Sequence, residues 1–182
     1  YRVVPINISQ DDQFQPDFLK ISPNNKIPAI VDQDGPRGEP ISVFESGAIL
    51  QYLARKSAQF YPNDEVERIE VEQWLMWQMA GFGPMLGQNH HFSRFAPERI
   101  VYATERYINE TKRLYRVLDT QLTNRDYVAG DYSIADMAIL PWILRHEWQQ
   151  VDLADYPHVL AYMQRLTARP AVQRALAIQL TA

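Results

Sequence analysis

The stretch Asn24–Leu50 reads N-N-K-I-P-A-I-V-D-Q-D-G-P-R-G-E-P-I-S-V-F-E-S-G-A-I-L and carries the clearest structural signals in the chain. Pro28 opens an apolar run, and a proline at the start of a strand costs the sheet no hydrogen bond. A segment rich in turn residues separates this run from a second strand-like segment, Ile41–Phe44. The sequence therefore predicts a β-hairpin, followed by a helix over Ala48–Lys56 that has Ser46 as its N-cap.

The same stretch predicts a binding site for a small zwitterionic peptide. If the Ile27–Pro28 bond is cis, the N–H and C=O of Ile27 turn outward and can pair with an extended ligand, as an added strand would. Free N–H groups at the helix start near Ser46 form an anion site, and Glu45 beside them accepts an ammonium group. Each motif alone fits an ordinary strand or a capped turn. Together they favour a site that offers backbone hydrogen bonds, an anion site for a carboxylate and an acceptor for an ammonium group.

The motifs I-P-A-I-V-D and F-E-S-G-A-I-L resemble the glutathione site of the soluble glutathione transferases. The longer string I-S-P-N-N-K-I-P-A-I-V-D, with P-M-L-G-Q-N-H-H-F further on, resembles one branch. That branch holds the bacterial nu-class enzymes and the yeast nitrogen-regulator prion protein. The resemblance covers nearly the whole chain and implies an α/β plus all-α architecture. We expect a thioredoxin-like glutathione-binding domain at residues 1–57 and an all-helical C-terminal domain at residues 65–182.

The family's N-terminal domain starts with a strand and a helix that come before the strand-like run Arg2–Ile8. We expect these two elements to be missing from this chain. The residue that activates the glutathione sulfur lies in that missing segment. The resemblance implies that it is a threonine or an asparagine, with no essential tyrosine.

The resemblance also implies which residues bind glutathione. The Ile27 backbone would pair with the cysteinyl unit, Glu45 and Ser46 would hold the γ-glutamyl end, and a basic side chain would attract the glycyl carboxylate. The alternative for Lys26 is a plain surface lysine. The full expected set is Asn25, Lys26, Ile27, Pro28, Glu45 and Ser46.

Beyond a linker at Ala58–Asp64 the pattern is helical. A helix is predicted over Glu65–Met79, after which two glycines and a proline at positions 81–84 should kink the chain. A long helix is predicted over Pro97–Leu122, with Ile100, Tyr107, Leu114, Val117, Leu118 and Leu122 as its buried stripe.

The resemblance places a second-substrate pocket between these helices, with Phe92 and Tyr102 as walls. It makes Arg106 a catalytic residue that holds a carboxylate or the negative charge developing on sulfur. The alternative is an exposed helix arginine paired with Tyr102 or Glu110.

Two further polar groups are predicted to be structural. Ser133 and Asp136 have the spacing of a capping box, so Asp136 is not expected to act as a general base. His90 and His91 are adjacent, so they do not face one site on a helix. They are expected to pack where domains or subunits meet, and no metal site is predicted.

Composition excludes several function classes. The net charge of −4 speaks against a general nucleic-acid or anionic-membrane binder. No apolar run approaches the ~20 residues of a membrane span. The chain has no cysteine, which excludes a disulfide framework, a cysteine nucleophile and thiolate metal sites within this stretch. Redox chemistry in which the thiol belongs to a ligand is still possible. A cytoplasmic location is expected.

Three functions remain open. The resemblance favours glutathione-dependent disulfide reduction, with glutathione as co-substrate and Arg106 serving the charge of a second glutathione or of glutathione disulfide. The alternatives are conjugation of glutathione to electrophiles and a non-catalytic regulatory role on the same fold. A homodimer is expected from the family.

Overall fold

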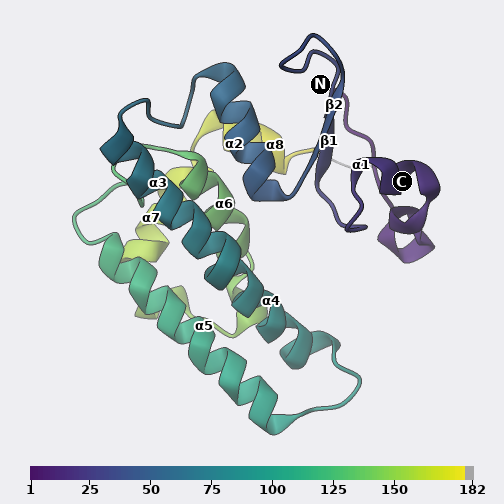
Figure 1. The fold of residues 1–182 in the computed structure, drawn as a ribbon. Helices are drawn as coiled ribbons and strands as arrows, with labels where there is room; N and C mark the ends of the chain where they lie inside the picture. Colours follow the sequence, from purple (N-terminus) through teal and green to yellow (C-terminus); the bar gives the residue numbers. More distant parts are fainter. Residues whose placement is uncertain (179–182) are drawn as a thin grey trace. The chain divides into compact units, whose positions relative to one another are not determined.

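The structure, a computed structural model, describes residues 1–178. The chain divides into two compact units, unit 1 from Tyr1 to Ser57 and unit 2 from Ala58 to Leu176 (Figure 1). Unit 1 combines a small sheet with helices, and unit 2 is helical apart from an isolated bridge between Tyr127 and Gly130. The predicted α/β plus all-α class is confirmed.

Unit 1 is built on the predicted hairpin. Its strands β1 and β2 are antiparallel, with Ala29 opposite Phe44 and Asp32 opposite Ile41. Gly35 is required in the connection, because a Cβ there would lie 2.4 Å from the carbonyl oxygen of Glu39. The elements of this unit are α1 (Pro16–Ile21), β1 (Ala29–Asp32), β2 (Ile41–Phe44) and α2 (Ser46–Ser57), after two 3-10 turns at Ile8–Gln10 and Asp12–Phe14.

The strand predicted at Arg2–Ile8 is wrong. Residues 1–7 have no regular secondary structure, and the sheet contains only β1 and β2. A strand is stabilised by hydrogen bonds to a neighbour, and Pro5 has no N–H to donate. The segment is instead followed by a turn in which the Asn7 N–H donates to the Asp12 carboxylate at 2.8 Å.

Unit 2 is a bundle in which α4 packs along α5 and α3 packs along α6 (Figure 1). Its helices are α3 (Glu65–Trp77), α4 (Gly83–His90), α5 (Val101–Gln121), α6 (Ile134–Ile143), α7 (Pro157–Thr167) and α8 (Pro170–Leu176). None of the helices within residues 1–178 has the length and apolarity that crossing a membrane requires.

The predicted interruption after the first helix of unit 2 is a π-helical segment, Gln78–Phe82, and a second one, His91–Phe95, follows α4. Gly83 directly follows the first of them and leaves room for two side chains. A Cβ there would lie 2.7 Å from Gln78 Nε2 and 3.0 Å from Trp142 Nε1.

The predicted start of the long helix at Pro97 is wrong, because α5 begins at Val101. Ala96, the residue before the proline, has extended backbone angles (φ −59°, ψ 138°), as pre-proline residues prefer. Ile100 is also extended (φ −99°, ψ 94°), and it is exposed instead of buried. The later part of the predicted stripe is confirmed, since Leu114, Leu118 and Leu122 are buried.

Helix α6 forms the centre of unit 2. Ile134, Ile139 and Ile143 on α6 are almost fully buried. The predicted capping box is present at its start, where the Ser133 N–H donates to Asp136 at 2.8 Å. Asp136 also accepts hydrogen bonds from the Val128 N–H at 3.0 Å and from the Tyr162 hydroxyl at 2.7 Å.

A buried polar network crosses unit 2. The Asn89 amide of α4 donates to the Thr111 hydroxyl at 3.0 Å and to the Gln149 carbonyl at 2.9 Å. The Tyr115 hydroxyl donates to the side-chain oxygen of Gln149 at 2.7 Å, and the Gln149 amide donates to the Trp142 carbonyl at 2.8 Å. These bonds satisfy polar groups that would otherwise destabilise the interior.

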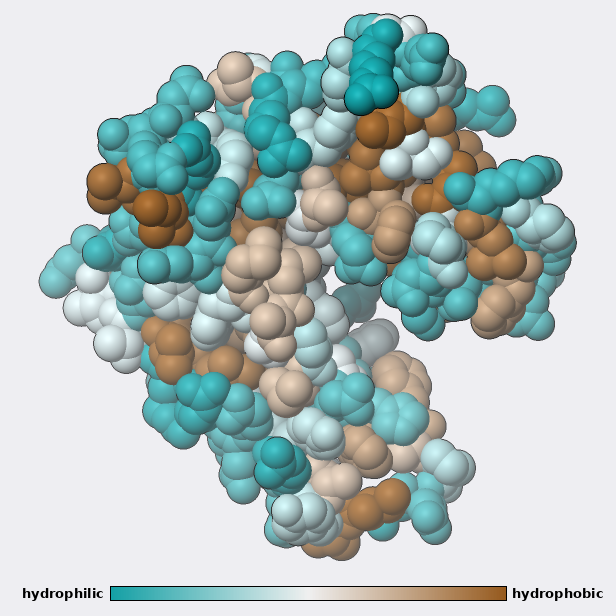
Figure 2. Space-filling model, viewed as in Figure 1, coloured by the Kyte–Doolittle hydropathy of each residue, from teal (hydrophilic) through white to brown (hydrophobic). Residues whose placement is uncertain are grey.

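Unit 1 buries few apolar side chains. Figure 2 shows one face of the molecule, on which apolar patches lie among hydrophilic residues. The exposed apolar residues of unit 1 are Val3, Val4, Ile8, Phe14, Ile27, Val31, Ile41, Phe44 and Leu53.

Replacing Asp136 should destabilise unit 2 strongly. Asp136→Ala leaves the donors of Val128, Ser133 and Tyr162 without their partner, which should cost about 3–5 kcal/mol of unfolding free energy. Tyr162→Phe removes one of these bonds and should cost about 1–2 kcal/mol. Urea unfolding measures both values.

Asp155→Ala is the matched control, because Asp155 is an exposed aspartate of the same unit. Equal unfolding midpoints for Asp136→Ala and Asp155→Ala would contradict the structural role of Asp136.

Candidate functional site

The predicted cis peptide bond between Ile27 and Pro28 is present. The turn before it is tied together by the Ser22 hydroxyl, which donates to the Lys26 carbonyl at 2.7 Å. Ile27 is 54% exposed, and within residues 1–178 its N–H and C=O take part in no hydrogen bond. This residue therefore offers a backbone donor and acceptor to an extended ligand.

Two of the predicted site residues have left-handed backbone conformations. Asn25 has φ 51° and Glu45 has φ 69°. Asparagine tolerates this region, but glutamate rarely adopts it, and residues held in such conformations cluster at functional sites. The side-chain amide of Asn24 reaches Glu45 Oε1 at 3.5 Å, so the structure brings the two motifs of the Asn24–Leu50 stretch together.

The predicted N-cap is displaced by one residue. Helix α2 begins with Ser46 itself, and the Ile49 N–H donates to the Glu45 carbonyl at 2.9 Å. Glu45 occupies the cap position, because its carbonyl accepts the first intrahelical hydrogen bond. The first N–H groups of a helix have no intrahelical acceptor, so an anion can still bind beside the Glu45 carboxylate.

Lys26 is exposed and forms no ion pair with any residue in the described part of the chain. Both alternatives for this residue, a ligand contact and a plain surface lysine, fit that position. Pro28 is also exposed.

A polar cluster at Asp32 joins the hairpin to the far end of α2. The Asp32 carboxylate accepts hydrogen bonds from Lys56 Nζ and from the Tyr52 hydroxyl, both at 2.6 Å. Lys56 also donates to the Asp34 carbonyl at 2.5 Å. The hydrogen bond from Lys56, followed in size of effect by the one from Tyr52, lowers the pKa of Asp32 to about 2.

In unit 2, Arg106 lines a hollow of ≈ 670 Å³ on the surface of α5. Tyr102, which is 76% exposed, also lines it, and Met85 contributes from α4. The alternative pairing of Arg106 with Glu110 is not formed, because Glu110 pairs with Arg113 at 2.7 Å. In the described part of the chain, Arg106 has no ion-pair partner.

Phe92 does not line this hollow. Its ring stacks on Tyr107, with centroids 5.4 Å apart and an interplanar angle of 7°. Tyr107 is the aromatic wall in its place. The sequence assigned Tyr107 to the buried stripe. In the structure Tyr107 is half-buried, so its ring can pack on Phe92 and also line the hollow.

The paired histidines have separate surroundings within unit 2. His90 lies between Trp142 and Trp148, with ring centroids 5.9 and 5.8 Å away, and His91 meets Phe92 edge to face at 4.9 Å. Burial, and then the charges of Arg145 and Arg94, lowers the pKa of His90. Across residues 1–178, no group of three or more His, Cys, Asp or Glu side chains could hold a metal ion.

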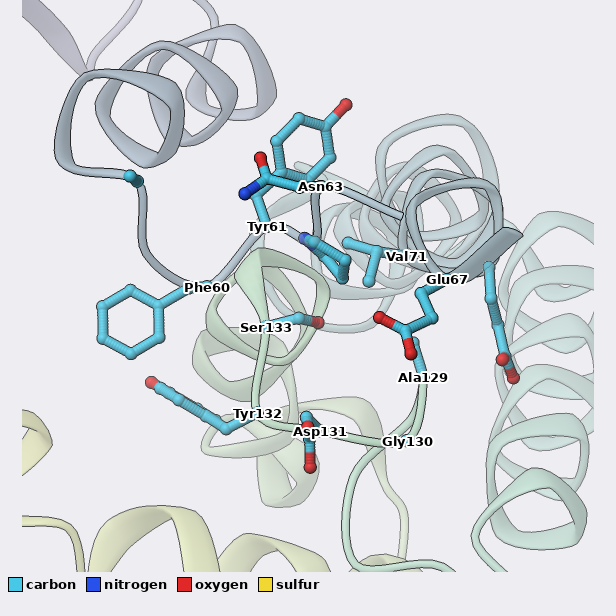
Figure 3. A pocket seen from close by; sticks show the side chains of 13 residues that line it. Phe60, Tyr61, Asn63, Glu67, Val71, Ala129, Gly130, Asp131, Tyr132 and Ser133 are labelled. Carbon is cyan, nitrogen blue, oxygen red and sulfur yellow. The ribbon is translucent and has the colours of Figure 1, made fainter. Parts of the chain in front are cut away.

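A second hollow in unit 2, of ≈ 660 Å³, lies between the Ala58–Asp64 linker and the segment that leads into α6 (Figure 3). Phe60 and Tyr132 meet edge to face with ring centroids 5.5 Å apart, and the Ile134 N–H donates to the Phe60 carbonyl at 3.1 Å. No residue predicted to bind ligand lines this hollow. The contacts of Phe60 with Tyr132 and Ile134 hold the linker against the start of α6.

Both halves of the chain match known domain families. Residues 1–55 match the glutathione S-transferase N-terminal domain, and residues 90–170 match the glutathione S-transferase C-terminal domain. The disulfide-bond oxidoreductase YfcG of Escherichia coli K12 is 52% identical over 180 residues, which cover 97% of this chain and 83% of that protein.

Solved structures show the same likeness. A Pseudomonas putida glutathione transferase with one glutathione disulfide bound per subunit has a TM-score of 0.93 and 45% identity, over 98% of this chain and 80% of that one. Ure2p in complex with S-hexylglutathione has a TM-score of 0.90 and 29% identity, over 97% of this chain and 86% of that one.

The Asp32 cluster should make the stability of unit 1 depend on pH. A carboxyl whose pKa is lowered by folding contributes stability above its unfolded pKa of ~4, and this contribution is lost as the pH falls through its folded pKa. For Asp32 that window runs from about pH 4 down to about pH 2. Carbon-detected NMR titration of the carboxyl measures its pKa.

Lys56→Gln should raise the pKa of Asp32, since it removes the main cause of the shift. Asp32→Asn should lose less stability than the wild type over the same window. An Asp32 pKa that is unchanged in Lys56→Gln would contradict the assignment.

Proposed function

Because this chain belongs to the glutathione S-transferase family, we propose that it reduces disulfide bonds with glutathione as its co-substrate. Unit 1 has the thioredoxin-like fold of the family's N-terminal domain, and unit 2 has its helical C-terminal fold. The observation that carries the proposal is the unpaired backbone of Ile27 beside the strained Glu45, in a chain without cysteine. The likeness to YfcG and to the glutathione disulfide complex supports it.

Glutathione binding is assigned to unit 1. The Ile27 N–H and C=O pair with the cysteinyl unit of the ligand, and the cis Pro28 keeps them turned toward it. Glu45 accepts the γ-glutamyl ammonium, and the N–H groups at the start of α2, near Ser46, bind the adjoining carboxylate. Asn25 and Lys26 hold the glycyl carboxylate.

The chemistry is thiol–disulfide exchange carried by ligand sulfur. The thiolate of bound glutathione attacks one sulfur of the substrate disulfide, forms a mixed disulfide and expels the other sulfur as a thiolate, which takes up a proton. A second glutathione thiolate then attacks the glutathione sulfur of the mixed disulfide. Glutathione disulfide forms and the second substrate thiol is released, so that two glutathiones are oxidised for each disulfide reduced.

Arg106 is assigned to the second glutathione. Its unpaired guanidinium lines the hollow on α5 with Tyr102, and it can bind a carboxylate through two parallel hydrogen bonds. The same positive charge stabilises the thiolate that forms as a disulfide breaks. Phe92 supports this site indirectly, by stacking on Tyr107.

We also propose that the protein works as a homodimer in the cytoplasm. The homodimer is proposed because the chain belongs to a family that is usually dimeric. A reducing compartment keeps the glutathione pool in the thiol form that this reaction consumes.

Glu45→Gly separates the binding role of Glu45 from its role in the fold. Glycine adopts a positive φ without penalty, so the melting temperature should stay the same or rise. Loss of the charge-assisted hydrogen bond to the ammonium should weaken glutathione binding about 10- to 100-fold. Calorimetric titration with glutathione measures the affinity.

Glu39→Ala is the control for that experiment, because Glu39 is an exposed glutamate in the β1–β2 connection of the same unit. Wild-type affinity in Glu45→Gly would remove Glu45 from the site.

Arg106→Ala tests the reductase reaction. We expect kcat/KM for glutathione-dependent disulfide reduction to fall about tenfold or more, because a hydrogen bond to a charged group is lost. The loss in conjugation of glutathione to a neutral electrophile should be far smaller. Arg174→Ala, which changes an exposed arginine of α8, is the matched control.

Calorimetry of the full-length protein separates the three functions. Tighter binding of glutathione disulfide than of glutathione, lost in Arg106→Ala, supports the reductase. Binding of reduced glutathione alone would favour conjugation, and binding of neither would favour a regulatory protein. Wild-type disulfide reduction by Arg106→Ala would show that the assignment of Arg106 is wrong.

A further inference from the structure

We infer that Arg113 is a positioning residue that keeps Arg106 available for an anionic substrate by holding Glu110 away from it. The inference rests on the proposed function, because it concerns the charge that Arg106 presents to glutathione disulfide. It assigns roles to two residues, Glu110 and Arg113, that the binding site described above does not use.

The three side chains occupy one face of α5. Glu110 lies four residues after Arg106 and three residues before Arg113, so both arginines are within helical reach of its carboxylate. All three line the same hollow, together with Tyr102, Tyr107 and Arg116. A carboxylate in this position could neutralise either arginine.

The structure shows which arginine Glu110 pairs with. Arg113 donates twice, from Nε to Oε2 at 2.8 Å and from Nη2 to Oε1 at 2.7 Å. A two-pronged bond of this kind fixes the orientation of the carboxylate as well as its charge. The hydrogen bonds from Arg113 are the main reason that the pKa of Glu110 lies below its usual range, against an opposing effect of burial.

Arg106 also acts on Glu110, but only through its charge. Its contribution to the lowered pKa of Glu110 is the smallest of the causes, and no ion pair joins the two side chains. The pair Glu110–Arg113 is therefore internally neutral, and the charge of Arg106 is left for a ligand. If Arg113 were removed, the released carboxylate would have Arg106 one turn away as its nearest partner.

A released Glu110 would compete with the substrate. Glutathione disulfide is net anionic at neutral pH, and its carboxylates need the same guanidinium that Glu110 would then occupy. Exposed ion pairs are worth about 0.2–1 kcal/mol, so Arg113→Gln should raise the Kd for glutathione disulfide about two- to fivefold. The kcat should change little, because the effect is on binding.

The test is a double-mutant cycle with Arg113→Gln, Glu110→Gln and the double variant. Binding of glutathione disulfide is measured by calorimetry, and KM for glutathione-dependent reduction is measured with a small uncharged disulfide. Adding Glu110→Gln to Arg113→Gln should reverse most of the loss in affinity for glutathione disulfide. The KM for the uncharged disulfide should stay the same in all variants.

Arg116→Gln is the matched control. It removes a positive charge from the same hollow, but Arg116 does not bond to Glu110. Any loss of affinity in Arg116→Gln should therefore persist when Glu110→Gln is added. This difference separates release of Glu110 from a simple loss of positive charge.

Three results would overturn the inference. They are an unchanged Kd in Arg113→Gln, a loss that Glu110→Gln does not reverse, and a rise in KM for the uncharged disulfide as large as the rise in Kd for glutathione disulfide, which would indicate a structural role only. In each case the wild type still binds glutathione disulfide, so the proposed function stands. A wild type that does not bind glutathione disulfide would overturn both.

Discussion

The helical unit depends on one buried carboxylate. Asp136 accepts hydrogen bonds from the start of its own helix, from the loop at Val128 and from Tyr162 on α7. Burial raises the pKa of Asp136, and the hydrogen bonds oppose this rise. Donors from three separate segments therefore stabilise the charged carboxylate. These bonds fix the start of α6, the helix with the most buried residues in the unit.

In the proposed site, the two units contribute different kinds of recognition. Unit 1 offers backbone groups, at Ile27 and at the start of α2, whose positions follow from a hairpin and a helix start. Unit 2 offers side-chain charge, at Arg106, whose strength depends on its neighbours along α5. Backbone groups cannot be altered by substitution without changing the fold, whereas the charge on α5 can be tuned by single residues.

The parts that sequence analysis predicted correctly are those fixed by local rules. The hairpin, the cis proline and the capping box each depend on a few adjacent residues whose stereochemistry allows little choice. The start of α5 was wrong because Pro97 satisfies the rule for a first helical position and also the rule for a turn, and the backbone of Ala96 decides between them. The stacking of Phe92 on Tyr107, fifteen positions away in the chain, is a contact that no local rule predicts.

The buried network at Asn89 and Gln149 could not be predicted at all. Its members come from α4, from α5 and from the turn after α6, and no sequence pattern links an asparagine to a carbonyl sixty residues later. Polar side chains in a helical sequence are normally assigned to the solvent face. They can be buried here because they hydrogen-bond to one another, and these hydrogen bonds form only in the folded bundle.

The π-helical segment Gln78–Phe82 has a consequence for the phase of the helix that follows it. A π turn holds about one residue more than an α turn, so it rotates every later side chain by about 100° around the helix axis. Gly83 and Gly87 face Trp142 in this rotated frame. One residue fewer between Gln78 and Phe82 would restore a continuous α-helix, but it would turn both glycines away from Trp142. The extra residue therefore changes the direction in which side chains point after Gln78–Phe82. Helices α3 and α4 follow each other without a break in helical structure but direct their side chains differently.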